Sequence, residues 1–107
     1  MSAKVLGQLA PSAATYTASL YNVPSGKQAI CSTLMVTNRS NTSDTFRIRI
    51  AVANASVDAK QYLFYDTSIN ANSSIPLTVG LTLAAGDYVY AGSNGGNLTF
   101  NLFGDEQ

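Results

Sequence analysis

Histidine and tryptophan are absent from the 107-residue sequence, and Cys31 is the only cysteine. Without histidine, the chain lacks the usual general base near neutral pH and the commonest protein ligand of transition metals. A single cysteine excludes an intramolecular disulfide and a zinc site built from several thiolates. Because Cys31 lies in the apolar run 29–36, we predict a small buried core residue. We therefore expect neither a catalytic triad nor a bound cofactor or metal.

Charged residues are also scarce, and six basic and six acidic side chains cancel to a net charge of zero. This balance removes the electrostatic argument for a nucleic acid or an anionic membrane as the partner. The N-terminus lacks the apolar stretch of about 7–15 residues found in secretory signals. No run approaches the roughly 20 apolar residues of a membrane helix. We expect a soluble protein made in a cytoplasm, with no membrane partner.

The acidic residues suggest no alternative chemistry. Their spacing does not favour a facing pair of carboxylates, as a glycosidase needs, and no loop concentrates carboxylates as a dedicated calcium loop does. We interpret them as solvated turn residues and predict that the protein is not an enzyme. They are Asp44, Asp58, Asp66, Asp87, Asp105 and Glu106.

Residues 44–52 alternate between apolar and polar side chains, which is typical of a half-buried strand. The pattern places Arg47 and Arg49 together on the polar face. These arginines could bind a phosphate or a partner's carboxylate, or form a solvated face that discourages edge aggregation. The residues predicted to face the core are Phe46, Ile48, Ile50 and Val52.

The segment 96–104 repeats this alternation, with Leu98, Phe100 and Leu102 predicted to face inward. Phe103 then points outward and breaks the polar face, so it is a candidate contact residue. Pro76 lies in a strand-like run and indicates an edge strand or a bulge, because proline donates no hydrogen bond to a sheet. Only residues 54–60 suggest a helical turn.

Strand-like runs and turn clusters recur about every 8–12 residues, the spacing of an all-β sandwich or barrel. We predict a single-domain antiparallel β-sandwich, jelly-roll-like, of about eight strands and filling residues 1–107. The remaining strand candidates are 4–9, which would be a short edge strand, 15–23, 27–38, 60–66, 72–79, 81–83 and 86–91.

The chain contains six tyrosines and no tryptophan. Alternation in the segments 62–65 and 88–90 cannot turn every ring toward one side. Outward tyrosines suit a protein interface or a sugar, whereas the alternative is a sandwich core with hydroxyls that reach its rim. The candidate platforms for a sugar are Tyr62, Tyr65, Tyr88 and Tyr90.

Several segments resemble a family of small structural virion proteins of tailed bacteriophages. The likeness spans nearly the whole chain and includes no catalytic motif. It is carried by KVLGQ at 4–8, LYNVPSGKQA at 20–29, VTNR at 36–39, TFRI at 45–48, KQYLFYD at 60–66, LTLAAGD at 81–87 and LTFNLFG at 98–104.

This resemblance implies a capsid decoration, or cement, protein on the outer surface of the phage head, made in the host cytoplasm. Such proteins are commonly trimeric, so the implied partners are further copies of the chain in a homotrimer and a major capsid protein. Alternatives are a neck, tail or baseplate adaptor, and a carbohydrate-binding module for host-surface glycans.

The predicted interface residues come from the chain end and from outward positions of the strands. The N-terminal stretch can clasp a neighbour, the arginines can pair with acids, and the rings face away from the core. They are Lys4, Val5, Leu6, Arg47, Arg49, Tyr65 and Phe103.

Overall fold

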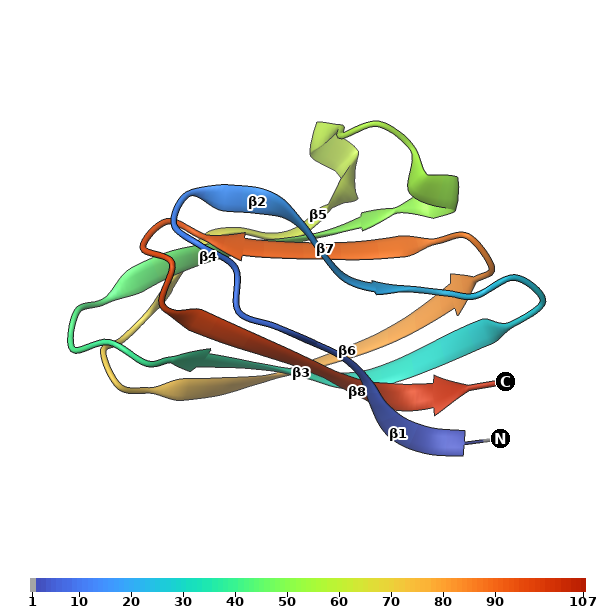
Figure 1. Ribbon diagram of the computed structural model, residues 1–107, viewed down its shortest axis with the longest axis horizontal. Coiled ribbons are helices and arrows are strands. Elements are labelled where there is room, and N and C mark those ends of the chain that lie inside the picture. Colours follow the sequence, from blue (N-terminus) through green and yellow to red (C-terminus); the bar gives the residue numbers. More distant parts are fainter. Residues whose placement is uncertain (1) are drawn as a thin grey trace.

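Strands make up most of residues 2–107, the part of the chain that the computed structural model describes. Two short 3-10 helices lie between the fourth and fifth strands (Figure 1). The elements are β1 (Ser2–Leu9), β2 (Thr15–Asn22), β3 (Gln28–Asn38), β4 (Asp44–Ala51), η1 (Val52–Asn54), η2 (Ala59–Gln61), β5 (Tyr62–Ile69), β6 (Ser74–Ala84), β7 (Tyr88–Ser93) and β8 (Leu98–Glu106).

The strands form two four-stranded antiparallel sheets, with the orders β1-β8-β3-β6 and β2-β7-β4-β5. The sheets lie one above the other, as Figure 1 shows, and the two chain ends lie at the same end of the sandwich. Successive strands alternate between the sheets except at the step from β4 to β5, which gives the strand order of a jelly roll. The predicted all-β sandwich is confirmed.

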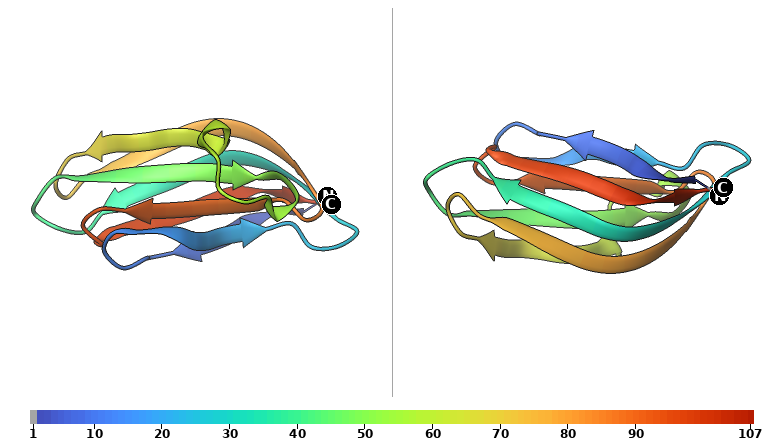
Figure 2. Two further views of the ribbon diagram at one scale, coloured as in Figure 1. Left: turned by 90° about the horizontal axis from the view of Figure 1, so that it is seen from above. Right: turned by 90° about the horizontal axis from the view of Figure 1, so that it is seen from below.

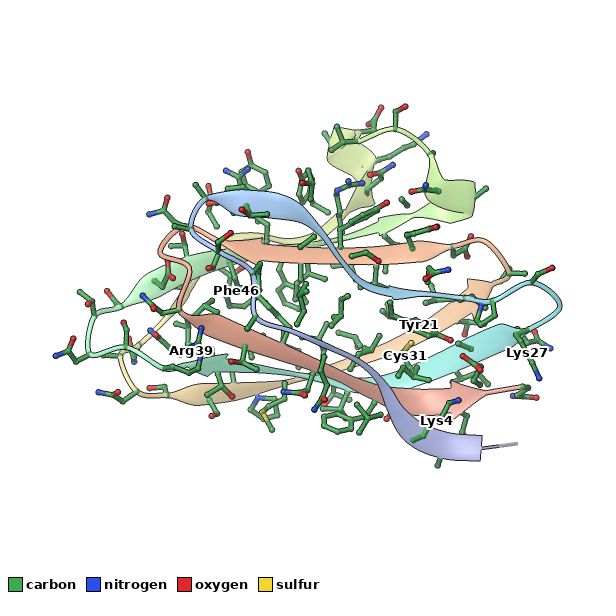
Figure 3. All side chains as sticks on the ribbon, viewed as in Figure 1. Lys4, Tyr21, Lys27, Cys31, Arg39 and Phe46 are labelled. Carbon is green, nitrogen blue, oxygen red and sulfur yellow. The ribbon has the colours of Figure 1, made fainter. Side chains whose placement is uncertain are left out.

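The core lies between the sheets and is built from alternate positions of each strand. Phe46 of one sheet meets Phe100 of the other edge-to-face, with ring centroids 6.3 Å apart, and Figure 3 shows Phe46 in the space between the layers. Leu98 and Leu102 are also fully buried. Cys31 is buried as predicted, and burial raises the pKa of its thiol to about 11.

Three local predictions need correction. The strand that contains Phe46 ends at Ala51, so Val52 begins η1 and its side chain is 66% exposed instead of buried. The segments 72–79 and 81–83 belong to one strand, β6, which passes through Gly80 at φ +54°. The helical turns occupy 52–54 and 59–61, at the two ends of the predicted segment.

All four sheet edges carry irregularities that oppose pairing with another chain. Where β1, β2, β5 or β6 pairs with its neighbour, the register shifts leave the extra residue on the edge strand. The edge strand β6 also contains Pro76, as the sequence indicated. Since bulges and proline blunt an edge, the outer faces of the sheets are the surfaces suited to partners.

Candidate interaction surfaces

The acidic residues act mainly as anchors for loops. Asp87 is buried, which corrects its prediction as a solvated turn residue, and its carboxylate accepts hydrogen bonds from the backbone N–H groups of Ala53 and Ala84. Asp44 accepts a bond from the backbone N–H of Gly95 at 2.9 Å. Within residues 2–107, no group of three or more His, Cys, Asp or Glu residues is placed to hold a metal ion.

An apolar hollow of about 430 Å³ lies on the outer face of the first sheet, near the chain ends. Val5 of β1 lies directly opposite Phe103 of β8 in the register, and Ile30 comes from the adjacent strand β3. Val5 and Ile30 are both more than two-fifths exposed. Lys4 and Asp105 add opposite charges to its lining. We call this surface the Phe103 hollow.

The other predicted N-terminal residues have different surroundings. A bulge at Leu6 turns this side chain toward the core, where it is partly buried. Lys4 forms an exposed ion pair with Glu106, with Nζ 3.4 Å from the carboxylate oxygen. The hydroxyl of Tyr21 donates to the other oxygen of Glu106 at 2.7 Å. These contacts lower the pKa of Glu106 and tie the two chain ends to the second sheet.

The tyrosines gather on the outer face of the second sheet. Only Tyr21 takes no part in the ring contacts there. The five residues with rings on this face are Tyr16, Tyr62, Tyr65, Tyr88 and Tyr90.

Arg47 is the centre of this tyrosine face because of a bulge in β5. Phe46 pairs with Thr67 and Ile48 with Phe64, so Tyr65 and Asp66 both lie opposite Arg47. Asp66 adopts φ +50° in this bulge, a conformation that aspartate tolerates better than most residues. A bulge can redirect side chains, and here it directs a ring and a carboxylate to one cation.

The guanidinium of Arg47 lies between two aromatic rings. Its Cζ atom is 4.1 Å from the ring centroid of Tyr65 and 4.2 Å from that of Tyr16. Its Nε donates to Asp66 at 2.7 Å, and a second nitrogen donates at 3.3 Å. The hydrogen bond to Asp66 raises the pKa of Arg47 further, and the same bond lowers the pKa of Asp66.

Gly92 makes the contact with Tyr16 possible. It lies opposite Arg47 on β7, between β4 and the edge strand β2. A Cβ atom there would lie 1.7 Å from the carbonyl oxygen of Thr15. The absence of a side chain therefore lets β2 approach closely and allows the Tyr16 ring to reach Arg47.

Arg49 has a different environment from the one predicted. Its side chain is 6% exposed, stacks on Tyr90 at 4.1 Å and donates to Oε1 of Gln61 at 2.6 Å. Gln61 in turn donates to the carbonyl oxygen of Ser56 at 2.8 Å. Segment 52–61 rises above this sheet in Figure 1 and extends over it in Figure 2. Arg49 therefore holds this loop instead of facing solvent.

The four candidate sugar platforms fall into two pairs. Tyr88 and Tyr90 are nearly parallel, with an interplanar angle of 12°, but both are half-buried, and the Tyr90 hydroxyl donates to Asn54. Tyr62 and Tyr65 are perpendicular, with centroids 4.9 Å apart, and Tyr65 is 58% exposed. The second pair lines an open hollow.

The sequence analysis missed two contributors to these surfaces. Ile30 lies in an apolar run that indicated a buried strand. In the structure its neighbours Ala29 and Cys31 are buried, and Ile30 between them points outward. Tyr16 reaches Arg47 only through the placement of β2. No pattern in the sequence indicates that contact.

The fold defines the class of the protein as a jelly-roll β-sandwich. No protein-family model, curated protein or solved structure matches the chain. Of the helices in residues 2–107, none is long and apolar enough to cross a lipid bilayer.

Proposed function

We propose that the protein is a non-enzymatic structural component of a phage particle and acts as a capsid decoration protein. One observation carries this proposal: a neutral domain with blunted sheet edges presents the exposed Val5 and Ile30 and the half-buried Phe103 together on one sheet face. Exposed apolar side chains that gather on one face mark a site of protein contact. The sequence resemblance to phage virion proteins supports the same assignment.

In this mechanism the Phe103 hollow seats a side chain of the capsid lattice or of a second copy. Lys4 and Asp105 at its lining offer both signs of charge, so a partner with opposite charges at matching positions aligns over the hollow. Each joint adds buried area, with a standard interface burying roughly 1,600 Å² in total. Many such joints act together against the pressure of packaged DNA.

Immunogold electron microscopy of intact particles tests the location. An antibody against the chain should label the head evenly. Label confined to the neck or tail tip would contradict decoration and favour the adaptor. An absence of the chain from purified particles by mass spectrometry would remove both assignments.

A binding assay tests the surface. Purified Phe103→Ser protein should remain folded but fail to coat heads that lack the protein, because the serine leaves the hollow without its ring. The control Val52→Ser changes an exposed residue on the other sheet's loop and should coat normally. Analytical ultracentrifugation of both variants and the wild type measures whether the chain is a homotrimer. Normal coating by Phe103→Ser would overturn the role of this hollow.

A further inference from the structure

A second hollow, of about 500 Å³, lies on the tyrosine face beside the loop 52–61. Its volume falls within the range of small-molecule sites. We propose that this tyrosine hollow binds a neutral saccharide, with Tyr65 as the stacking platform. The residues that line it are Val57, Asp58, Ala59, Tyr62 and Tyr65.

The ring of Tyr65 is held in place before any ligand arrives. The Cζ atom of Arg47 lies over the ring, 4.1 Å from its centroid. The ring of Tyr62 packs against it with an interplanar angle of 88°. The side chain is nevertheless more exposed than any other ring in the described chain. A fixed aromatic ring loses little conformational entropy on binding. Tyr65 therefore offers a flat apolar surface to the C–H groups of a sugar ring.

The polar groups around this ring can accept hydrogen bonds from a ligand. One carboxylate oxygen of Asp58 accepts from the backbone N–H of Lys60 at 3.2 Å, and the described residues give its second oxygen no partner. The hydroxyls of Tyr62 and Tyr65 likewise make no hydrogen bond to residues 2–107. A carboxylate only accepts hydrogen bonds. Neighbouring hydroxyl groups of a sugar can donate to it in place of water.

Other ligand classes fit this chemistry less well. A quaternary ammonium ion would compete with the guanidinium of Arg47, on the other face of the ring, for attraction to the same π-system. An anion would meet the carboxylate of Asp58 at the lining of the hollow. A proline-rich segment presents carbonyl oxygens, which accept hydrogen bonds, to a carboxylate that also accepts. A neutral polyol satisfies both the ring and the carboxylate.

Chemical-shift mapping of the purified full chain tests the proposal. The probes are the methyl glycosides of glucose, galactose, mannose and N-acetylglucosamine, and then maltose and lactose. At least one should shift the amides of 57–65 and saturate with a Kd of about 1 mM, a weak affinity suited to one ring and few hydrogen bonds. Tetramethylammonium and an oligoproline peptide should leave these amides unchanged.

Variants assign the binding to Tyr65 and Asp58. Tyr65→Ala should weaken binding at least tenfold, and Asp58→Asn should weaken it several-fold because the amide is a poorer acceptor. Phe103→Ser, on the opposite sheet, is the matched control and should bind like the wild type. The amide spectrum of each variant shows whether it is folded. If Tyr65→Ala is misfolded, Tyr65→Leu removes the aromatic face while keeping apolar bulk.

Three results would overturn the proposal: no probe shifts the amides of 57–65, shifts appear only around Phe103, or tetramethylammonium or oligoproline binds in place of the sugars. The assay uses protein alone, so it is independent of the decoration assignment. Heads that carry label while the protein binds no sugar would remove only the saccharide site. Sugar binding without label on particles would remove only decoration.

Discussion

The two outer faces of this sandwich are built in opposite ways. On the face of β1-β8-β3-β6, the apolar side chains of the Phe103 hollow share its lining with Lys4 and Asp105. The cross-strand contacts of this sheet are isolated pairs, such as the ion pair of Lys4 with Glu106 and the hydrogen bond from Gln8 to Asn101. The face of β2-β7-β4-β5 instead carries stacked arginines, tyrosines and carboxylates that connect its strands. The first face is therefore suited to covering by a partner, whereas the second is already organised around its own side chains.

This difference also shows in where the two arginines of one strand lie. Arg47 and Arg49 are two residues apart on β4, and both stack on tyrosines. The loop 52–61 lies over Arg49 and buries it, while Arg47 remains partly open beside Tyr65. Arg49 therefore orders a loop, whereas Arg47 supports an exposed ring.

The largest expected loss of stability follows from adding a side chain between the strands of the tyrosine face. In Gly92→Ala, the new Cβ would overlap the carbonyl oxygen of Thr15 and force β2 away from β7. Overpacking of this kind costs about 3 kcal/mol, and urea unfolding measures it. The matched control is Gly80→Ala on the other sheet, where nothing lies within 4 Å of the added Cβ. At Gly80 only the left-handed φ is unfavourable for alanine, at a cost of about 1–2 kcal/mol. A larger loss of stability in Gly80→Ala than in Gly92→Ala would contradict the close approach of β2 to β7.

The next effect comes from releasing the loop. Arg49→Met keeps apolar bulk beneath Tyr90 but leaves Oε1 of Gln61 without its donor. An unpaired buried acceptor costs about 2 kcal/mol. Hydrogen exchange should show faster exchange of amides in 55–61, with little change in β8. The control Arg47→Met removes the neighbouring arginine and should leave loop exchange unchanged; equal loosening by both variants would refute a specific role for Arg49.

A smaller effect is expected where the faces are joined at the chain ends. Tyr21→Phe removes the hydroxyl that donates to Glu106, and loss of a hydrogen bond to a charged group costs about 1.5 kcal/mol. The pKa of Glu106 should then rise toward its ordinary value of 4.5 because this bond is the largest cause of its lowering. NMR titration measures the pKa. Tyr16→Phe removes a hydroxyl on the tyrosine face and should leave Glu106 unchanged.

The sequence predicted most of the fold because alternation reports directly on burial. Phe46, Ile48 and Phe100 were assigned to the core from period-two patterns, and all three are fully buried. Val52 fitted the same pattern and lies on the surface, because the strand ends one residue earlier. Periodicity gives the direction of a side chain only while the strand continues.

The surfaces were harder to predict because they depend on register. Phe103 and Val5 were both proposed as contact residues, but nothing in the sequence places them opposite one another. The contacts of Arg47 depend on an extra residue in β5, and the burial of Arg49 depends on a loop folding over it. Bulges and loop positions are tertiary properties, and a single sequence carries only weak indications of them.

The smallest effect concerns the exposed ion pair of the tyrosine face. Arg47 lowers the pKa of Asp66 below its ordinary value of 3.8. A carboxylate with a lowered folded-state pKa stabilises the protein fully above the unfolded value, and this contribution disappears as the pH falls through the folded value. Asp66→Asn should therefore be slightly less stable than the wild type at neutral pH, and the difference should shrink as the pH falls below 3.8 and vanish once the pH is below the lowered pKa of folded Asp66. Urea unfolding across this range measures it, and about 1 M salt should shrink it by screening. A difference that stays constant with pH would show that Asp66 acts through the shape of the bulge and not through its charge.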